Sequence, residues 1–204
     1  MTNSAEPEGA PGASLDPATV WSRVFTVAPL VVVGTKEGDG YDLAPKHMAT
    51  PLGWEEHYGF VCTPDHGTYR NAREHGAFTV SYPRPDQAVV TSLTATPREG
   101  ENEPTPGLSA LPTAPAERVD GVVLREAHLA LECETDRIID GFGRGSLIVG
   151  RIVAARAHPD ALRASEVEDE DLIRAWPLLA YLAPGRYARI SETHAFPFPA
   201  GFQR

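Results

Sequence analysis

Apolar residues occur along this chain mainly in short, β-branched runs that are separated by turn residues. Such runs are typical of buried or half-buried strands, and they predict strands over residues 29–35, 57–63, 77–82, 127–139, 146–155 and 181–190. Helical signals are few: one segment opens at Asp16-Pro17 and runs to residue 22, and a weaker one spans residues 87–94. We therefore expect a mainly β fold, an antiparallel barrel that is closed or partly closed, with a few short flanking helices.

Two glycine-rich segments predict hairpin turns between these strands. Glu37-Gly-Asp-Gly40 follows the first strand, and Gly and Asp tolerate the positive φ angles of tight hairpins. Gly141-Phe-Gly-Arg-Gly145 superficially resembles a dinucleotide-binding loop. That loop lies between a strand and a helix, whereas a β-branched strand follows here. A hairpin turn is the better interpretation.

The chain is expected to form one domain with a tail at each end. Residues 1–15 have the composition of a disordered N-terminal tail, and residues 16–190 carry the predicted domain. Within the domain, residues 96–115 are rich in Pro, Gly, Glu and Thr and lack periodicity, which predicts a loop insertion. Residues 191–204 form a proline-rich C-terminal tail, which is unsuited to a central strand and is expected to pack onto its own domain or a partner subunit.

Composition narrows the function classes. The 204-residue chain has a formal net charge of -10 and a pI of about 5.1, which argues against a general nucleic-acid surface or a polybasic membrane face. No apolar run approaches membrane-spanning length, and the N-terminus lacks the features of a signal peptide. Cys62 and Cys133 lie far apart in apolar segments, which favours buried free thiols in a reducing cytoplasm.

The segment His66-Gly-Thr-Tyr-Arg-Asn71 concentrates groups that bind phosphate. It combines an imidazole, a flexible glycine, a hydroxyl, a guanidinium and an amide at the predicted start of a short helix. Thr68 is interpreted as the N-cap, whose hydroxyl accepts backbone N–H groups one turn later. The other N–H groups of the first turn, the helix dipole and Arg70 together predict an anion site. The expected occupant is a phosphate-bearing ligand.

The segment Lys46-His47-Met48 interrupts the strand alternation and has two interpretations. It is either a solvated turn with a core methionine, or a backbone ledge whose N–H groups face a planar ring, with Lys46 helping to hold a phosphate. Other chemistry has little support. The seven histidines show no metal-ligand spacing with a third ligand nearby, so no metal is expected, and no nucleophile elbow is present.

In their order along the chain, these segments resemble the flavin reductase-like family, whose fold is the FMN-binding split barrel. The resemblance covers roughly residues 25–190, and the ordered set carries it rather than any single motif. The matching segments are Pro29-Leu-Val-Val-Val-Gly-Thr35, the Gly-Asp-Gly turn, Asp42-Leu-Ala-Pro45, Thr68-Tyr-Arg-Asn71, His75-Gly-Ala-Phe-Thr-Val80, residues 127–134, Ser146-Leu-Ile-Val-Gly-Arg-Ile-Val153 and Pro177-Leu-Leu-Ala-Tyr-Leu-Ala-Pro-Gly-Arg-Tyr187.

The resemblance implies a homodimer that binds FMN, or FAD in some members, at the subunit interface. It implies an oxidoreductase that reduces flavin with NADH or NADPH, in many members for a partner monooxygenase. Because the chemistry would belong to the flavin, no catalytic side chain is named. Carried over position by position, the residues expected beside the flavin or its phosphate are Lys46, His47, Met48, Ala49, Thr50, Cys62, Thr63, His66, Thr68, Arg70 and Asn71.

Three departures from the family pattern bear on function. His66-Gly67 stands where relatives often carry Lys-Asp, and Lys46-His47 replaces aromatic and serine residues. Arg144-Gly145 stands where many relatives carry an Asp-His pair. The last departure favours an alternative function, an FMN-binding electron carrier or sensor without nicotinamide activity. A split barrel that has lost flavin and serves as a scaffold is a third interpretation.

Overall fold

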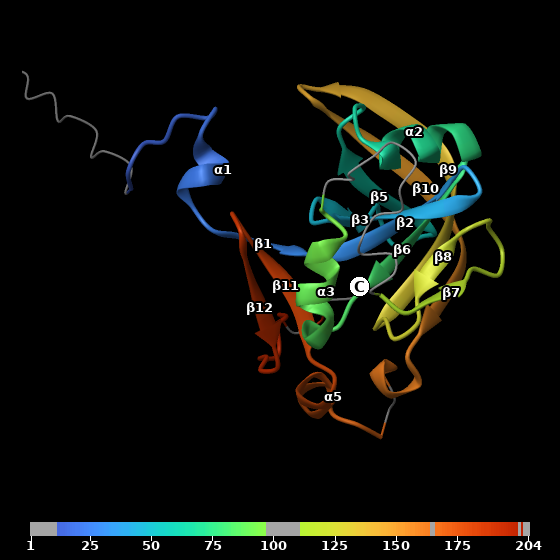
Figure 1. Cartoon of the computed structure of the whole chain (residues 1–204). Coiled ribbons are helices and arrows are strands. Elements are labelled where there is room, and N and C mark those ends of the chain that lie inside the picture. Colours follow the sequence, from blue (N-terminus) through green and yellow to red (C-terminus); the bar gives the residue numbers. More distant parts are fainter. Residues whose placement is uncertain (1–11, 97–110, 164–165, 200, 202–204) are drawn as a thin grey trace, which may run out of the picture.

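A computed structural model describes residues 12–96, 111–163, 166–199 and 201, and it confirms the mainly β fold (Figure 1). The largest element is a seven-stranded antiparallel sheet in the order β3-β2-β6-β9-β10-β5-β4. Its strands are β2 (Val31–Glu37), β3 (Gly40–Lys46), β4 (Ala49–Pro51), β5 (His57–Cys62), β6 (Ala77–Tyr82), β9 (Leu129–Phe142) and β10 (Gly145–Ala157). Both glycine-rich segments form the predicted hairpin turns, between β2 and β3 and between β9 and β10.

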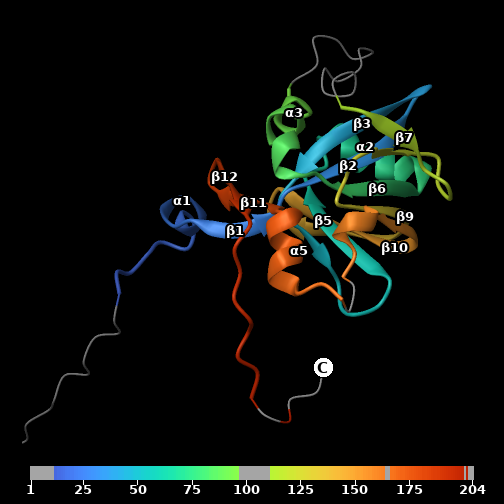
Figure 2. The ribbon, with the colours of Figure 1, turned by 90° about the horizontal axis from the view of Figure 1, so that it is seen from below.

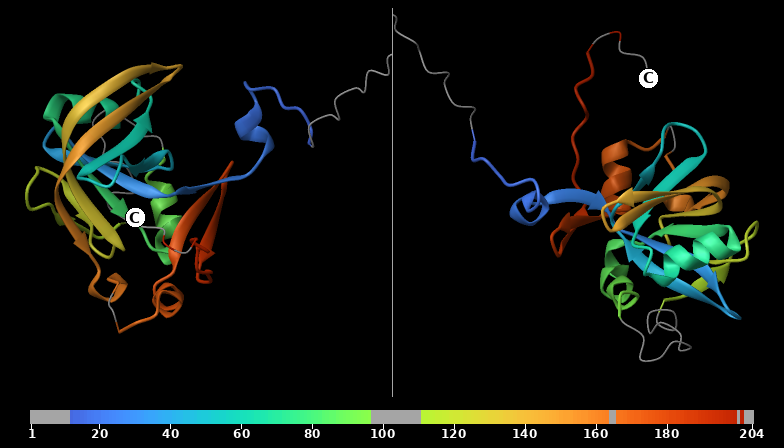
Figure 3. Two further views of the ribbon diagram at one scale, coloured as in Figure 1. Left: turned by 180° about the vertical axis from the view of Figure 1, so that it is seen from behind. Right: turned by 90° about the horizontal axis from the view of Figure 1, so that it is seen from above.

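The strand order requires this sheet to curl. β3 and β4 are neighbours in sequence, with only His47 and Met48 between them, yet they occupy opposite edges of the sheet. A two-residue connection reaches only about 10 Å, so the two edges approach each other where β3 ends and β4 begins. Figure 3 shows the resulting half-barrel.

A second, three-stranded sheet lies beside the half-barrel. It contains β1 (Thr26–Pro29), β11 (Leu178–Ala183) and β12 (Arg186–Ile190) in the order β1-β11-β12 (Figures 1 and 2). The single strand predicted over 181–190 is therefore wrong. This range contains a turn at Pro184-Gly185, where Gly185 has a φ of +76° and the Ala183–Pro184 bond is cis. The strand predicted over 29–35 is also divided, because the chain passes from one sheet to the other at Leu30.

A third, two-stranded sheet has no counterpart among the predicted strands. It pairs β7 (Thr113–Pro115) with β8 (Val122–Leu124). β7 falls within the predicted loop insertion, of which residues 97–110 lie outside the described residues, as do residues 1–11 of the predicted N-terminal tail. Residues 191–199 contain no helix or strand and extend from β12 away from the body (Figure 3). Phe196 in this segment is exposed, so it does not pack onto its own domain.

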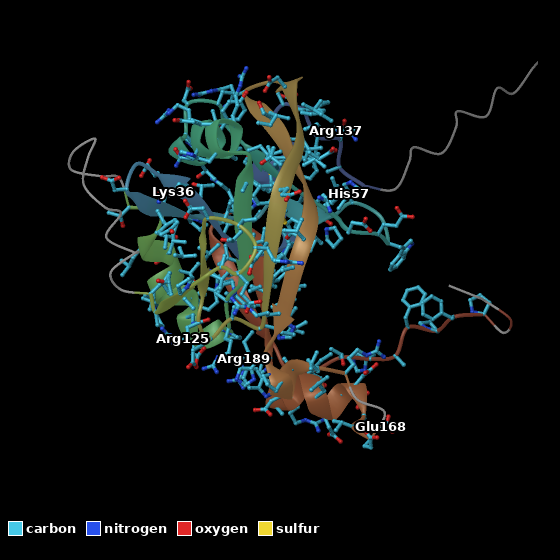
Figure 4. The ribbon with its side chains drawn as sticks, turned by 90° about the vertical axis from the view of Figure 1, so that its right-hand side faces the viewer. Lys36, His57, Arg125, Arg137, Glu168 and Arg189 are labelled. Atoms are coloured by element: carbon cyan, nitrogen blue, oxygen red, sulfur yellow. The ribbon has the colours of Figure 1, made fainter. Side chains whose placement is uncertain are left out.

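The helices are short and lie around the sheets: α1 (Val20–Arg23), α2 (Gly67–His75), α3 (Ala88–Leu93) and α5 (Asp169–Ala175), with 3-10 turns at Pro85–Gln87 and Pro159–Ala161. The predicted helix at residues 16–22 is reduced to α1, and the weak helix at 87–94 is present as α3. Figure 4 shows Glu168, which precedes α5, at the opposite end of the molecule from Arg137 of β9. In the described part of the chain, no helix is long and apolar enough to cross a membrane.

The core lies inside the half-barrel and includes both cysteines as buried free thiols, as predicted. Burial, with a smaller contribution from the charge of Glu132, raises the pKa of Cys133 to about 12. Gly150 of β10 permits close packing, because a Cβ there would lie 2.5 Å from the ring of Phe78. Other members of this core are Val31, Val33, Tyr58, Phe60, Val80 and Ile148.

Glu132 of β9 is a buried carboxylate that holds the loop between β7 and β8. Its two oxygens accept hydrogen bonds from the backbone N–H groups of Glu117, Arg118 and Val119 at 2.6 to 3.3 Å. Its side chain is only 3% exposed. A buried charge needs such partners, so this carboxylate fixes the loop to the half-barrel.

Candidate functional site

Residues 46–50, here called the seam strip, join the two edges of the half-barrel. The strip is attached to β5 because β4 pairs with it and because the carbonyl of Met48 accepts the N–H of Val61 at 2.8 Å. Within the described residues, the amides of His47 and Met48 have no backbone acceptor. Of the two interpretations, the one with a core methionine does not hold, since the side chain of Met48 is 57% exposed. The geometry therefore favours a backbone ledge.

Within the strip, the side chain of His47 contacts the small sheet. Its ring stacks on Tyr181 of β11, with centroids 4.5 Å apart and planes inclined by 26°. Burial, and secondarily the positive charge of Lys46, lowers the pKa of His47 below its ordinary value. The imidazole is therefore neutral near pH 7, with one ring nitrogen as donor and the other as acceptor.

The remaining strip and β5 residues divide between core and surface. Ala49 and Cys62 belong to the hydrophobic core, whereas Thr50 is exposed and Thr63 half-buried. The thiol of Cys62 lies 4.0 Å from Nδ1 of His66. Ala49 and Cys62 thus shape this region mainly by packing.

The start of α2 differs from the prediction. The N-cap is His66 rather than Thr68, and no side-chain hydrogen bond caps this helix. Thr68 is buried in the second helical position, where its hydroxyl donates to Asp42 of β3 at 3.4 Å. Asn71 is also buried, and its amide donates to Thr35 and Glu37 of β2. Both side chains therefore fasten α2 to the β2–β3 hairpin.

Arg70 and His66 remain on the surface of this turn. The guanidinium of Arg70 donates to the carbonyl of Asp65 at 2.6 Å. Among the described residues it forms no ion pair, so its charge is available to an anion. The first turn of α2 contains no acidic residue, although Glu37 and Asp42 lie beneath it in the β2–β3 hairpin.

The fold adds residues that the sequence did not assign to the site. A hollow of about 320 Å³ separates Thr63 and Asp65 from the β9–β10 hairpin, which contributes Arg144 and Ser146. Asp140 of that hairpin accepts from Ser146 Oγ at 2.6 Å and from Tyr69 Oη at 3.1 Å. Both hydrogen bonds lower the pKa of Asp140, and the bond from Ser146 has the larger effect. Only the departure from the family pattern at Arg144 signalled this region in the sequence.

The site therefore has two connected parts, the seam strip with the end of β5 and the turn at the start of α2. Two of the residues expected in the site face away from it. The seam strip and the end of β5 are joined through β4–β5 pairing, and Thr63 leads into the turn that bears His66 and Arg70. Thr68 and Asn71 face the β2–β3 hairpin instead. This arrangement offers backbone donors to a planar ring at the strip and a cation to an anion at the turn.

Solved structures share this architecture. Flavoredoxin from Methanosarcina acetivorans has a TM-score of 0.75 at 19% identity, with 94% of this chain and 98% of that chain covered. A protein described as a flavin reductase with a split barrel domain, from Shewanella frigidimarina, has a TM-score of 0.74 at 15% identity, with 85% and 87% covered. At these identities the likeness concerns the fold, which is the split barrel.

A third structure is a homologue of nitrilotriacetate monooxygenase component B from Mycobacterium thermoresistibile. It has a TM-score of 0.68 at 12% identity, with 88% of this chain and 89% of that chain covered. No curated protein matched the chain. Residues 23–191 match the family described as the flavin reductase like domain. Because this match spans most of the sequence, the chain belongs to the flavin reductase like domain family.

Proposed function

We propose that this protein binds FMN, with FAD as the alternative flavin, and catalyses flavin reduction by NADH or NADPH. The observation that carries the proposal is the family match over residues 23–191, which contains the seam strip and the turn at α2. The proposal extends to a homodimer with flavin at the subunit interface. It names no catalytic side chain.

The residues of the seam strip fit a flavin ring. The ring presents a planar face and an edge of nitrogen and oxygen atoms, which need hydrogen-bond partners in a protein. The amides of His47 and Met48, which lack backbone acceptors in the described chain, are suitable donors. In this proposal residues 46–50, Cys62 and Thr63 border the ring, hold it in place and exclude water from one face. When bound, the flavin supplies the hydride-accepting chemistry.

The turn at the start of α2 also fits a phosphate, but through a different set of residues from the one that the sequence predicted. The hydroxyl of Thr68 is directed to Asp42 and is unsuited to a phosphate contact in this arrangement. Arg70 and His66 at the surface of the helix start are the proposed contacts, together with backbone N–H groups. Thr68 and Asn71 are proposed to support the turn through the β2–β3 hairpin. Lys46 is proposed as a further cation near the phosphate.

The partner proposed for the reduced flavin is an oxygen-using enzyme. Two structures with this fold are components of such systems by description: a homologue of nitrilotriacetate monooxygenase component B, and the flavin reductase component of a two-component tryptophan halogenase. The cytoplasm is the proposed location, because both cysteines are buried free thiols.

A second function, FMN-binding electron transfer without nicotinamide activity, is favoured by one observation. The β9–β10 hairpin places Arg144 and Gly145 beside the hollow at Thr63, in the position where many relatives carry an Asp-His pair. Flavoredoxin is among the similar structures.

The two functions are separated by a spectroscopic titration. Purified protein is mixed with FMN or FAD, and binding is followed by the visible spectrum. NADH or NADPH is then added without air. Bleaching of flavin absorbance by either donor, faster than without protein, is expected for a flavin reductase. Bound flavin that only a protein donor reduces supports the electron carrier, and absence of flavin binding contradicts both.

A further inference from the structure

A cavity of about 340 Å³ lies beside the seam strip, between α3 and the β11–β12 hairpin. Its walls come from segments that are far apart in sequence: the end of β3, the inner side of α3 and the turn at Gly185. Figure 1 shows α3 and β11 side by side. The volume lies in the range of small-molecule pockets.

The cavity exists because α3 presents small side chains to it. Ala88, Thr91 and Ser92 of α3 line the cavity, and their spacing of three residues and one residue places them on one helical face; Ala95, which follows the helix, also lines it. The outer face carries the larger Val89, which is exposed. Larger residues on the inner face would fill the space.

Thr91 gives the cavity wall a polar group that the protein does not use. The residue is fully buried, and its Oγ1 has no hydrogen-bond partner among the described residues. Valine has nearly the same shape and would avoid the cost of an unsatisfied hydroxyl. Threonine in a helix has two accessible χ1 rotamers, so this hydroxyl can turn to meet a group in the cavity.

The opposite wall consists of aromatic rings with a cation at the mouth. Tyr181 and Tyr187 are register partners in the β11–β12 hairpin, so both rings lie on one face of the sheet. His47 stacks on Tyr181 and joins the same wall. Arg186 is exposed and forms no ion pair with a described residue.

We propose that this cavity binds a small aromatic carboxylate. Its ring lies between the small side chains of α3 and the tyrosine rings, a polar ring substituent bonds to Thr91, and its carboxylate pairs with Arg186. His47 belongs to both this cavity and the seam strip, so the ligand sits against the strip from the side of β11. Binding at this cavity depends on the cavity geometry and does not require flavin reduction.

Isothermal titration calorimetry with salicylate as the probe tests this proposal, with benzoate and salicylamide as matched ligands. Arg186→Gln, a surface change that leaves the core intact, is expected to weaken salicylate binding about five- to tenfold and to leave salicylamide binding unchanged. Thr91→Val is expected to weaken salicylate binding but not benzoate binding. Ser92→Leu, which narrows the cavity, is expected to abolish binding of all three.

Val89→Leu on the outer face of α3 is the control and should leave every affinity unchanged. Three outcomes overturn the proposal: no salicylate binding at millimolar concentration, an equal loss for salicylate and salicylamide in Arg186→Gln, or loss of salicylate binding when FMN or FAD saturates the protein. The last outcome would assign the cavity to the flavin. A failure of FMN binding alone leaves the salicylate result standing, which separates this inference from the proposed function.

Discussion

His47 illustrates how single residues in this protein depend on distant neighbours. Its place in the seam strip is evident from the sequence, next to Lys46. Its neutral state and fixed ring are not, because they arise from burial against Tyr181, a residue of another sheet. Thr68 is a similar case. The residue type is correct for a helix start, but the carboxylate of Asp42 draws its hydroxyl inward.

Removal of the charge at residue 46 should change the titration of His47. Lys46→Gln is expected to raise the pKa of His47, because a neighbouring cation disfavours the imidazolium. Burial is the larger effect, so the pKa should stay below the ordinary value of about 6.5. NMR titration of the imidazole resonances measures this. The pKa of His128 is lowered by burial alone and should not move; an unchanged or lower pKa of His47 would contradict the assignment.

The same shift affects stability. Because the pKa of folded His47 lies below that of the unfolded chain, the contribution of this residue to stability is complete above about pH 6.5. It is lost as the pH falls from that value through the folded pKa. The free energy of unfolding of a His47→Gln variant should depend less steeply on pH in that window.

Glu132→Ala should destabilise the protein strongly. The change removes a buried carboxylate that accepts from three backbone N–H groups, and the expected loss is about 3 kcal/mol in urea unfolding at neutral pH. Glu134→Gln is the matched control on the same strand. Its exposed ion pair with Arg151 should contribute less than about 1 kcal/mol. Equal losses in the two variants would be inconsistent with the role given to Glu132.

At the scale of elements, hydrophobic patterning predicted the long strands well and the short ones poorly. β5, β6, β9 and β10 carry enough alternating or β-branched residues for the period to be visible. β4, β7 and β8 have three residues each, too few for a period. β4 pairs with the longer β5, whereas β7 and β8 pair with each other. β11 and β12 merge in the sequence because only Pro184 and Gly185 separate them.

The start of α2 should distinguish a phosphate contact from a structural one. Arg70→Ala is expected to weaken FMN binding by about 1.5 kcal/mol, because a charged contact to phosphate is lost, and to leave riboflavin binding unchanged. Thr68→Val should instead lower the melting temperature and weaken the binding of FMN and of riboflavin equally, since the hydroxyl of Thr68 bonds to Asp42.

Fluorescence titration with each flavin measures both effects. An equal loss of FMN and riboflavin affinity in Arg70→Ala would show that this turn does not hold the phosphate.

At the scale of the whole molecule, the segment from α1 to β1 has the features of a subunit contact. Trp21, Phe25 and Val27 are 68%, 65% and 71% exposed. β1 is an edge strand of the small sheet, and on its outer side it pairs with no strand of the described residues. Large exposed apolar side chains beside a free strand edge favour association with another chain.

A variant with Phe25→Ser and Val27→Thr should therefore dissociate more readily. The dissociation constant of the proposed dimer is expected to rise about tenfold or more, because apolar anchors contribute most at interfaces. Sedimentation velocity over a concentration series measures this. Trp54→Ser is the control, since Trp54 is exposed in the β4–β5 turn, outside the segment from α1 to β1. A monomeric wild-type protein would contradict the proposal.

The sequence by itself determined the mainly β class, the long strands, the two hairpin turns and the order of segments that identifies the family. These features depend on residues that are close together in the chain, where periodicity and turn chemistry act. Only the tertiary structure decided that β3 and β4 meet across the seam, that Thr68 and Asn71 face inward, and that His47 meets Tyr181. Each of these depends on the strand order of a curled sheet, and no local pattern encodes which distant residues that curl brings into contact.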